Sequence, residues 1–387
     1  MINKISVIGA GTMGSGIAQV AASNNWQVTI IDLYPQVLEN SQSKLKSILN
    51  RLVEKGKIDE NEAKSILSNI NWTSDMKEIS HSNLVIEAII ENMEIKQKLF
   101  SQMESLVSDN CILATNTSSL SVTGIASICS NQSRAMGVHF FNPVPLMKLV
   151  EVIPTEKTDY ELCQNVKSIL KSWGKSVVTA KDTPGFIVNR VARPFYGEAL
   201  KIYEEGIADF ATIDWAMKEC GGFRMGPFEL MDYIGNDINY TATKAVYDGT
   251  NHDPRYKSSP TQKKMMDEGL LGRKSGEGYF DYSESAVNPE PQKNEKLGRK
   301  IFNRILAMLI NAAADALNTS IATRDDIDTA MKTGVNYPKG LLKWADEIGI
   351  ENVLKQLQGL QSNSNDNRYQ PSPILIKMSQ DNTIFYS

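Results

Sequence analysis

Short apolar runs alternate with longer amphipathic stretches along the first half of the chain. The longest amphipathic stretch is Gln36–Lys55, in which apolar residues recur at helical spacing. The apolar runs are Ile5–Ile8, Val28–Ile31, Leu84–Ile86, Ile112–Leu113, Met136–His139, Leu149–Ile153 and Val177–Val178. Strand runs that alternate with helices in this way predict a doubly wound α/β sheet, which we expect to span residues 1–183.

A glycine cluster directly follows the first apolar run. Gly9, Gly11 and Gly14 match G-x-G-x-x-G, and Asp32 directly follows the second apolar run. In such a turn the first glycine permits the sharp bend, the second lets a pyrophosphate approach the backbone, and the third lets helix and strand pack closely. Glycine-rich turns without a ligand also exist. Here, however, strand, helix, second strand and acid follow in the order that a Rossmann-type dinucleotide-binding domain needs.

The residues around this turn indicate which dinucleotide binds. Backbone N–H groups of the first helical turn, including those of Thr12 and Met13, would face the pyrophosphate. Asp32 would accept hydrogen bonds from the adenosine ribose. Leu33 and Tyr34 stand where an arginine would bind a 2′-phosphate. The sequence therefore favours NAD over NADP.

After the segment Asp182–Gly185 the strand runs disappear and amphipathic helical segments dominate. This half contains an internal repeat at a constant offset of 114 residues. The matching pairs are Asn189-Arg190 with Asn303-Arg304, Ile213-Asp214 with Ile327-Asp328, Ala216–Lys218 with Ala330–Lys332, and Gly226 with Gly340. The polar segment Ser283–Lys296 is typical of a linker. We therefore predict a duplicated all-α domain, with one copy at 184–285 and a second, degenerate copy at 296–387.

Composition narrows the class of protein. The 387 residues carry 41 basic and 45 acidic side chains, so the net charge of −4 offers no basic field for nucleic acid. No apolar run approaches the roughly 20 residues that cross a bilayer, and the early first strand leaves no room for a signal peptide. The four cysteines form no C-x-x-C pair, which favours free thiols. We expect a cytoplasmic protein that binds no nucleic acid, membrane or metal.

Histidine is scarce, and one of the three histidines stands out. His81 and His252 lie in polar, turn-like segments and are expected at the surface. His139 ends an apolar run, and the carboxyl end of a strand in a doubly wound sheet opens onto the cofactor crevice. A histidine there can act as a general acid or base near neutral pH. The residues alone leave open a purely structural histidine that is hydrogen-bonded at a strand end.

Several longer motifs occur in one order along the chain. They are Asn116–Leu120, His139–Pro145, Lys148–Glu151, Asp182–Arg190, Met225–Asp232 and Gly272–Tyr279. In these motifs, over about residues 1–285, the chain resembles the 3-hydroxyacyl-CoA dehydrogenase family. The resemblance implies reversible, NAD-dependent oxidation of a (3S)-3-hydroxyacyl-CoA to the 3-oxoacyl-CoA.

The resemblance also implies a role for each residue of the site. His139 would take the hydroxyl proton of the substrate, and Glu151 would orient the imidazole and stabilise its charged form. Ser118 would donate a hydrogen bond to the reacting oxygen beside the nicotinamide. Asn189 would be a second donor, from the helical domain. Taken singly, Glu151 could be an exposed charge, and Ser118 and Asn189 could be helix caps.

Further matches concern the two nucleotides. The positions that the resemblance places near NAD are Glu91, Lys96, Asn142 and Lys274. For the phosphates of CoA, the candidates are the basic residues at the end of the Gln36–Lys55 helix, namely Arg51, Lys55 and Lys57. A solvated helix face would explain these three equally well.

The acyl group and the quaternary structure leave alternatives open. A short chain such as 3-hydroxybutyryl-CoA is the first expectation. The segment Asn189–Tyr196 and the duplicated helical half resemble the branch of phenylacetate breakdown, which makes 3-hydroxyadipyl-CoA the alternative, with Arg193 as a candidate cation. The second copy could replace a dimer partner, giving a pseudo-dimeric monomer instead of a homodimer, and Asn303 would then be structural.

Two other classes of protein share part of this pattern. Dehydrogenases of the 6-phosphogluconate or 3-hydroxyisobutyrate type share the two-domain plan but use a lysine as the base, so His139 with Glu151 argues against them. A non-catalytic NAD-binding module would have no use for Ser118, His139, Glu151 and Asn189 together.

Overall fold

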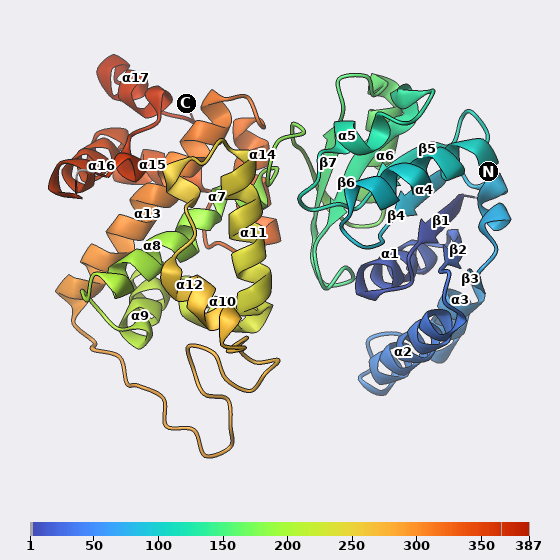
Figure 1. The fold of residues 1–387 in the computed structure, drawn as a ribbon, viewed down its shortest axis with the longest axis horizontal. Helices are drawn as coiled ribbons and strands as arrows, with labels where there is room; N and C mark the ends of the chain where they lie inside the picture. Colours follow the sequence, from blue (N-terminus) through green and yellow to red (C-terminus); the bar gives the residue numbers. More distant parts are fainter. Residues whose placement is uncertain (1–2, 365, 387) are drawn as a thin grey trace. The chain divides into compact units, whose positions relative to one another are not determined.

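An eight-stranded sheet forms the centre of the N-terminal unit of this computed structural model, which describes residues 3–364 and 366–386 (Figure 1). The strand order is β3-β2-β1-β4-β5-β6-β7-β8. Strands β1 to β6 run parallel, whereas β7 runs antiparallel to β6, and β8 runs parallel to β7. The strands are β1 (Lys4–Ile8), β2 (Gln27–Ile31), β3 (Ile70–Thr73), β4 (Leu84–Glu87), β5 (Ile112–Thr115), β6 (Ala135–Phe140), β7 (Leu149–Pro154) and β8 (Ser176–Thr179).

Helices cover both faces of this sheet, as the alternation of strands and helices predicts. Successive strand residues point to opposite faces, so Val7 joins one apolar cluster and Ile8 the other. The first cluster is covered by α1 (Thr12–Ser23), α2 (Pro35–Glu54), α3 (Glu60–Ser68) and α6 (Tyr160–Ser172). The second is covered by α4 (Met93–Leu106), α5 (Val122–Ala126) and the 3₁₀ helix η1 (Met76–His81). The doubly wound α/β fold is confirmed.

The second compact unit, Thr183–Ser387, is built from helices. Its longest helix, α13 (Glu295–Asn318), packs against α8 (Arg193–Glu204) and α9 (Phe210–Gly221) (Figure 1). The other helices are α7 (Val188–Val191), α10 (Pro227–Ile234), α11 (Asn236–Gly249), α12 (Pro260–Asp267), α14 (Arg324–Gly334), α15 (Leu341–Ile348), α16 (Ile350–Ser364) and α17 (Pro373–Asp381), with the short 3₁₀ helices η3 (Pro254–Tyr256) and η4 (Asn367–Tyr369). No helix in the described parts of the chain is long and apolar enough to cross a membrane.

The repeat in the sequence is a repeat in the structure. Asp214 accepts hydrogen bonds from the backbone N–H groups of the second and third residues of α10, and Asp328 does the same for α15. A Cβ atom at Gly226 would lie 2.2 Å from Cγ of Asp214, and one at Gly340 would lie 2.3 Å from Cγ of Asp328. Only glycine lets each carboxylate reach the start of its helix, which explains why the pattern recurs. The all-α unit is therefore duplicated.

Buried ion pairs join the two copies. Arg304 of the second copy donates from Nε to Oε1 of Glu198 in the first copy, at 2.6 Å. In the opposite sense, Arg190 and Arg255 of the first copy approach Asp315 of the second, at 3.5 and 3.0 Å. Glu198 is completely buried, so its charge depends on these partners.

Candidate functional site

The glycine turn between β1 and α1 forms a cradle for a phosphate group. Gly9 has a φ of +103°, and a Cβ atom there would lie 2.5 Å from the backbone oxygen of Ala88. At Gly14 a Cβ atom would lie 1.8 Å from the oxygen of Gly9, so helix and turn touch. Gly11 faces open space, since no heavy atom of the described residues lies within 4 Å of an added Cβ. Among the described residues no side chain caps the start of α1, which leaves the N–H groups of its first turn, including Thr12 and Met13, available to an anion.

Asp32 lies beside this turn at the end of β2. Its Oδ2 accepts from the backbone N–H of Ala10 at 2.9 Å, and its Oδ1 from that of Tyr34 at 3.1 Å. The carboxylate is thereby fixed next to the glycine turn, where a ribose hydroxyl can donate to it. Leu33 and Tyr34 are largely exposed and uncharged, so neither supplies a cation for a 2′-phosphate. These residues fit a dinucleotide with an unmodified adenosine ribose.

Glu91 holds the turn that contains Ser118. Its Oε1 accepts from Oγ1 of Thr117 at 2.6 Å and from the backbone N–H groups of Ser118 and Ser119 at 3.0 and 3.1 Å. Burial alone would raise the pKa of Glu91, but the Thr117 hydroxyl, the charge of Lys96 and these N–H groups lower it overall. Glu91 is therefore ionised and ties the Ser118 turn to the end of β4.

Lys96 lies inside the protein. Its side chain is 1% exposed, and its Nζ bonds to Glu87 and lies 3.3 Å from Oε2 of Glu91. The resemblance placed Lys96 and Glu91 together near NAD. In the structure Lys96 supports Glu91, which in turn supports Ser118, so we propose that Lys96 acts on the cofactor site through Glu91.

His139 and Glu151 form a buried pair on neighbouring strands. The antiparallel register of β6 and β7 places them directly opposite each other, and Nδ1 of His139 lies 2.7 Å from Oε2 of Glu151. The imidazole is 6% exposed and the carboxylate 0%. Because a carboxylate only accepts, the Nδ1 nitrogen carries the proton, and Nε2 is the basic nitrogen of the neutral ring. This arrangement suits a general base whose charged form is stabilised by a carboxylate.

Strand order brings Ser118 and His139 to one edge of the sheet. Strands β5 and β6 are parallel neighbours, and Ser118 follows the carboxyl end of β5 while His139 lies at that of β6. Oδ1 of Asn116 accepts from the backbone N–H of Phe140 at 2.8 Å and links the two strand ends. Asn116 was not predicted as a site residue, although its place at a strand end inside the Asn116–Leu120 motif could have suggested it.

Other predicted residues lie where a ligand could reach them. Asn142 is exposed in the connection between β6 and β7. Arg51 lies in the last turn of α2, and Lys55 and Lys57 just after it; all three are exposed. Within residues 3–364 and 366–386 none of these three side chains makes an ion pair. A CoA phosphate site and a solvated helix face both fit these exposed cations.

Asn189 and Lys274 belong to the helical unit. Asn189 lies in α7, is half-buried, and its carboxamide makes no hydrogen bond with the described residues. Nζ of Lys274 lies 2.5 and 2.7 Å from the carboxylate oxygens of Asp237. Burial would raise the pKa of Asp237, but the hydrogen bond from Lys274 lowers it overall. We propose that Lys274 also contacts the nucleotide, in which case its ammonium would interact with both the nucleotide and Asp237.

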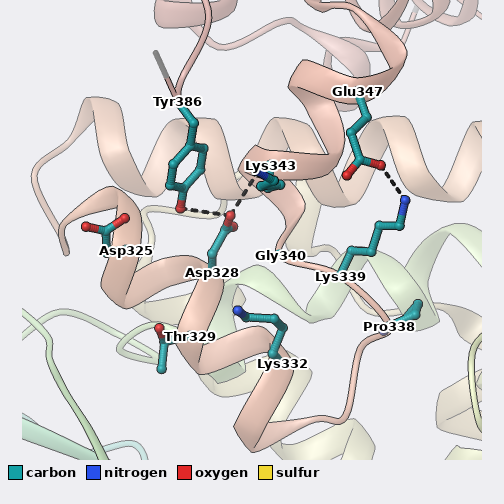
Figure 2. A pocket seen from close by; sticks show the side chains of 10 residues that line it. All are labelled: Asp325, Asp328, Thr329, Lys332, Pro338, Lys339, Gly340, Lys343, Glu347 and Tyr386. Atoms are coloured by element: carbon teal, nitrogen blue, oxygen red, sulfur yellow. Dashed lines mark hydrogen bonds and ion pairs between the residues drawn. The ribbon is translucent and has the colours of Figure 1, made fainter.

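A cavity of about 480 Å³ lies in the second helical copy (Figure 2). It is lined by Asp325, Asp328, Thr329, Lys332, Pro338, Lys339, Gly340, Lys343, Glu347 and Tyr386. The hydroxyl of Tyr386 donates to Asp328 at 3.0 Å, and Lys339 pairs with Glu347 (Figure 2). The cavity contains no histidine, so it does not reproduce the His139–Glu151 pair. No group of acidic, histidine or cysteine side chains in the described chain could hold a metal ion.

Comparisons with known proteins cover almost the whole chain. Residues 4–183 match the family model for the 3-hydroxyacyl-CoA dehydrogenase NAD binding domain, and residues 185–282 and 301–384 match the model for the C-terminal domain. A 3-hydroxyadipyl-CoA dehydrogenase of Escherichia coli K12 is 33% identical, with 97% of each chain covered. The mitochondrial hydroxyacyl-coenzyme A dehydrogenase of Sus scrofa is 40% identical over 73% of this chain and 92% of its own.

Solved structures agree with these sequence matches. The crystal structure of a 3-hydroxybutyryl-CoA dehydrogenase from Escherichia coli K12 superposes with a TM-score of 0.92, at 33% identity and 98% coverage of both chains. That of the (S)-3-hydroxybutyryl-CoA dehydrogenase from Ralstonia eutropha covers 73% of this chain and 100% of its own, with a TM-score of 0.71 and 36% identity.

Proposed function

Since this chain belongs to the 3-hydroxyacyl-CoA dehydrogenase family, we propose that it oxidises a short-chain (3S)-3-hydroxyacyl-CoA, such as 3-hydroxybutyryl-CoA, to the 3-oxoacyl-CoA. The observation that carries the proposal is the buried His139–Glu151 pair, which lies on the same sheet as the glycine turn and Asp32. NAD, when bound, accepts the hydride that leaves C3 of the substrate. The reaction belongs to fatty-acid or related acyl-CoA metabolism.

The residues of the site divide the remaining work. Nε2 of His139 takes the proton of the C3 hydroxyl as the C–H bond breaks, and Glu151 keeps the ring oriented and stabilises the imidazolium. In the reverse direction the same proton returns to the oxygen. Ser118 and Asn189 are proposed to donate hydrogen bonds to that oxygen, which polarises the carbonyl for reduction.

The reaction is tested by following NADH absorbance with acetoacetyl-CoA as the oxidised substrate. We expect oxidation of NADH that depends on the thioester and yields the (3S) product. A wild-type protein that binds NADH but does not oxidise it with any short 3-oxoacyl-CoA would be a non-catalytic NAD-binding module, and the proposal would be wrong.

A second candidate substrate is 3-hydroxyadipyl-CoA, which ends in a carboxylate. It is favoured by the full-length relative of that name and by Arg193, a 7% exposed cation. Within the described chain Nη1 of Arg193 donates only to the backbone oxygen of Asn239 at 3.4 Å and to Oγ1 of Thr243 at 3.3 Å, and Nε has no acceptor. Burial lowers the pKa of Arg193, and no carboxylate among the described residues forms an ion pair with it.

The position of Arg193 in the chain also suits this substrate. It follows Asn189 by four residues, roughly one helical turn or about 6 Å. If Asn189 contacts the C3 oxygen, a carboxylate three carbons beyond C3 falls within reach of a guanidinium at that separation.

A comparison of the two thioesters separates the candidates. We expect Arg193→Met to lower kcat/KM for 3-hydroxyadipyl-CoA about tenfold or more, because a charged hydrogen-bond partner is lost, and to change that for 3-hydroxybutyryl-CoA little. An equal loss on both substrates would assign Arg193 to the structure of the helical unit and leave 3-hydroxybutyryl-CoA as the proposed substrate.

We further propose three domains, at 1–183, 184–285 and 296–387, in a chain that acts as a pseudo-dimeric monomer. The two helical copies bind each other through the reciprocal ion pairs of Arg304 with Glu198 and of Arg190 with Asp315. A cytoplasmic location is also proposed, since all four cysteines are free thiols.

A further inference from the structure

A buried lysine lies beside the loop that joins the strands of His139 and Glu151. Lys175 follows α6 and directly precedes β8, and it is 9% exposed. Its Nζ donates to the backbone oxygens of Val144 at 2.6 Å and Met147 at 2.8 Å. Charge-assisted hydrogen bonds of this kind are about twice as strong as neutral ones. One ammonium therefore fastens the loop at two points.

No acidic side chain compensates the charge of Lys175. Within the described chain no carboxylate lies within 4.0 Å of its Nζ, and burial lowers the pKa of Lys175 to about 8. Helix α1 and strand β8 carry no titratable residue. The titratable groups on the other elements around it are Lys148 in the loop, Glu151 on β7 opposite His139, and Tyr160, Glu161, Cys163, Lys167 and Lys171 on α6.

The far side of the same loop packs against α1, the helix of the glycine turn. Val144 is 2% exposed, and a Cβ atom at Gly16 would lie 2.9 Å from Cβ of Val144. The loop also carries Asn142 and Phe141, and the ring of Phe141 lies 4.5 Å from that of His139. A change in the position of this loop would therefore reach both the imidazole and the cofactor side of the site.

We propose that Lys175 is a positioning residue of the dehydrogenase, whose ammonium holds residues 141–148 against α1 and so sets Asn142 at the cofactor and Phe141 against His139. The part of this proposal that concerns His139 rests on the proposed function. The effect of Lys175 on cofactor binding can be measured without a turnover assay. Lys175 itself touches neither reactant.

Three variants test it: Lys175→Met, which removes the charge and the donors; Lys175→Arg, which keeps both; and Lys171→Met, a control at an exposed lysine of α6. Kd for NADH is measured by fluorescence, and kcat and KM by NADH absorbance with acetoacetyl-CoA. We expect Lys175→Met to weaken NADH binding about tenfold and to lower kcat, with KM for the thioester nearly unchanged. Lys175→Arg should recover most of the affinity, and Lys171→Met should match the wild type.

The pH dependence of NADH binding distinguishes the proposed role of Lys175 from a purely structural one, which would leave that dependence unchanged. We expect the wild type to lose affinity, by about threefold, as the pH rises from 7 to 9.5, because a neutral amine donates weaker hydrogen bonds. Lys175→Arg should show no such loss, since its guanidinium stays charged throughout this range. NADH binding is chosen over turnover because His139 takes part in turnover.

A folded Lys175→Met protein with wild-type Kd for NADH and wild-type kcat would overturn the proposal. If that variant does not fold, the same alkaline loss of affinity in the wild type and in Lys175→Arg would overturn it equally. Failure of the proposed function is recognised separately, because a wild type without turnover would still show the binding effects.

Discussion

At His139 the partner of one ring nitrogen determines what the other can do. Oε2 of Glu151 lies 2.7 Å from Nδ1, and the carboxylate is completely buried. The pair therefore holds one tautomer and favours a positive charge on the ring once Nε2 has taken a proton. Glu91 likewise acts on Ser118 indirectly, because it accepts a hydrogen bond from the backbone of the turn that contains this serine. At both positions, the residue that is proposed to act on the substrate is kept in place by a neighbouring glutamate.

The variant Glu151→Gln tests this dependence. The amide keeps the size of the side chain but removes the negative charge, and its NH₂ group can favour the opposite imidazole tautomer. We expect kcat to fall about 10³-fold or more, with Kd for NADH unchanged. Glu161→Gln, at an exposed glutamate of α6, is the control. A kcat within tenfold of the wild type would show that Glu151 does not support His139.

At the scale of elements, the hydrophobic pattern predicts the strands that contribute apolar runs to the core, but not strand direction or the edge strand β3. Strands β1, β2, β4, β5, β6, β7 and β8 each contain a predicted apolar run, and in the inner strands β4, β5 and β6 every residue is buried, on both faces of the sheet. Strand β3 was not predicted, because its sequence Ile-Asn-Trp-Thr contains no two adjacent apolar residues, whereas the other edge strand, β8, carries the apolar pair Val177-Val178. The reversal of β7 was also not predicted, because an apolar run carries no strand direction, and that reversal places Glu151 opposite His139.

The polar contacts of the site were harder to predict than its positions. The place of His139 follows from the end of an apolar run, but the roles of Glu151, Ser118 and Asn189 came from the family resemblance. Lys175 was not predicted, because a lysine in a short turn is ordinarily exposed. Its burial arises from a loop that is distant in the sequence and supplies carbonyl acceptors.

Between elements, the packing of α8 against α13 depends on a buried ion pair. Arg304→Met would leave the fully buried Glu198 without its main partner, so we expect the helical unit to lose about 3 kcal/mol of unfolding free energy. The loss is measured by urea unfolding followed by helical circular dichroism. Arg299→Met on the same helix, where an exposed arginine pairs with Glu295, should change nothing measurable. Equal stability of Arg304→Met and the wild type would show that the pair does not hold the copies together.

At the scale of the whole molecule, the two helical copies pair each other's buried charges. Arg190 and Arg255 of the first copy meet Asp315 of the second, and Arg304 returns the contact to Glu198. Because these charged side chains are already paired within one chain, they do not require partners from a second chain. The duplication therefore favours a protein that works as one chain.

Size-exclusion chromatography with light scattering checks this expectation. We expect a mass near 43.0 kDa, that of the single chain. A dimer assembled through the first helical copy would contradict it, and Arg304→Met would show whether such a dimer forms only when the copies separate.

We propose that His139 is the base of this NAD-dependent 3-hydroxyacyl-CoA dehydrogenase. The most direct test of this proposal is the rate of NADH oxidation by His139→Gln with acetoacetyl-CoA, beside His81→Gln, a change at an exposed histidine. We predict that His139→Gln loses at least about 10²-fold in kcat while its Kd for NADH stays that of the wild type, and that His81→Gln is unaffected. Wild-type turnover in His139→Gln would show that His139 is not the base.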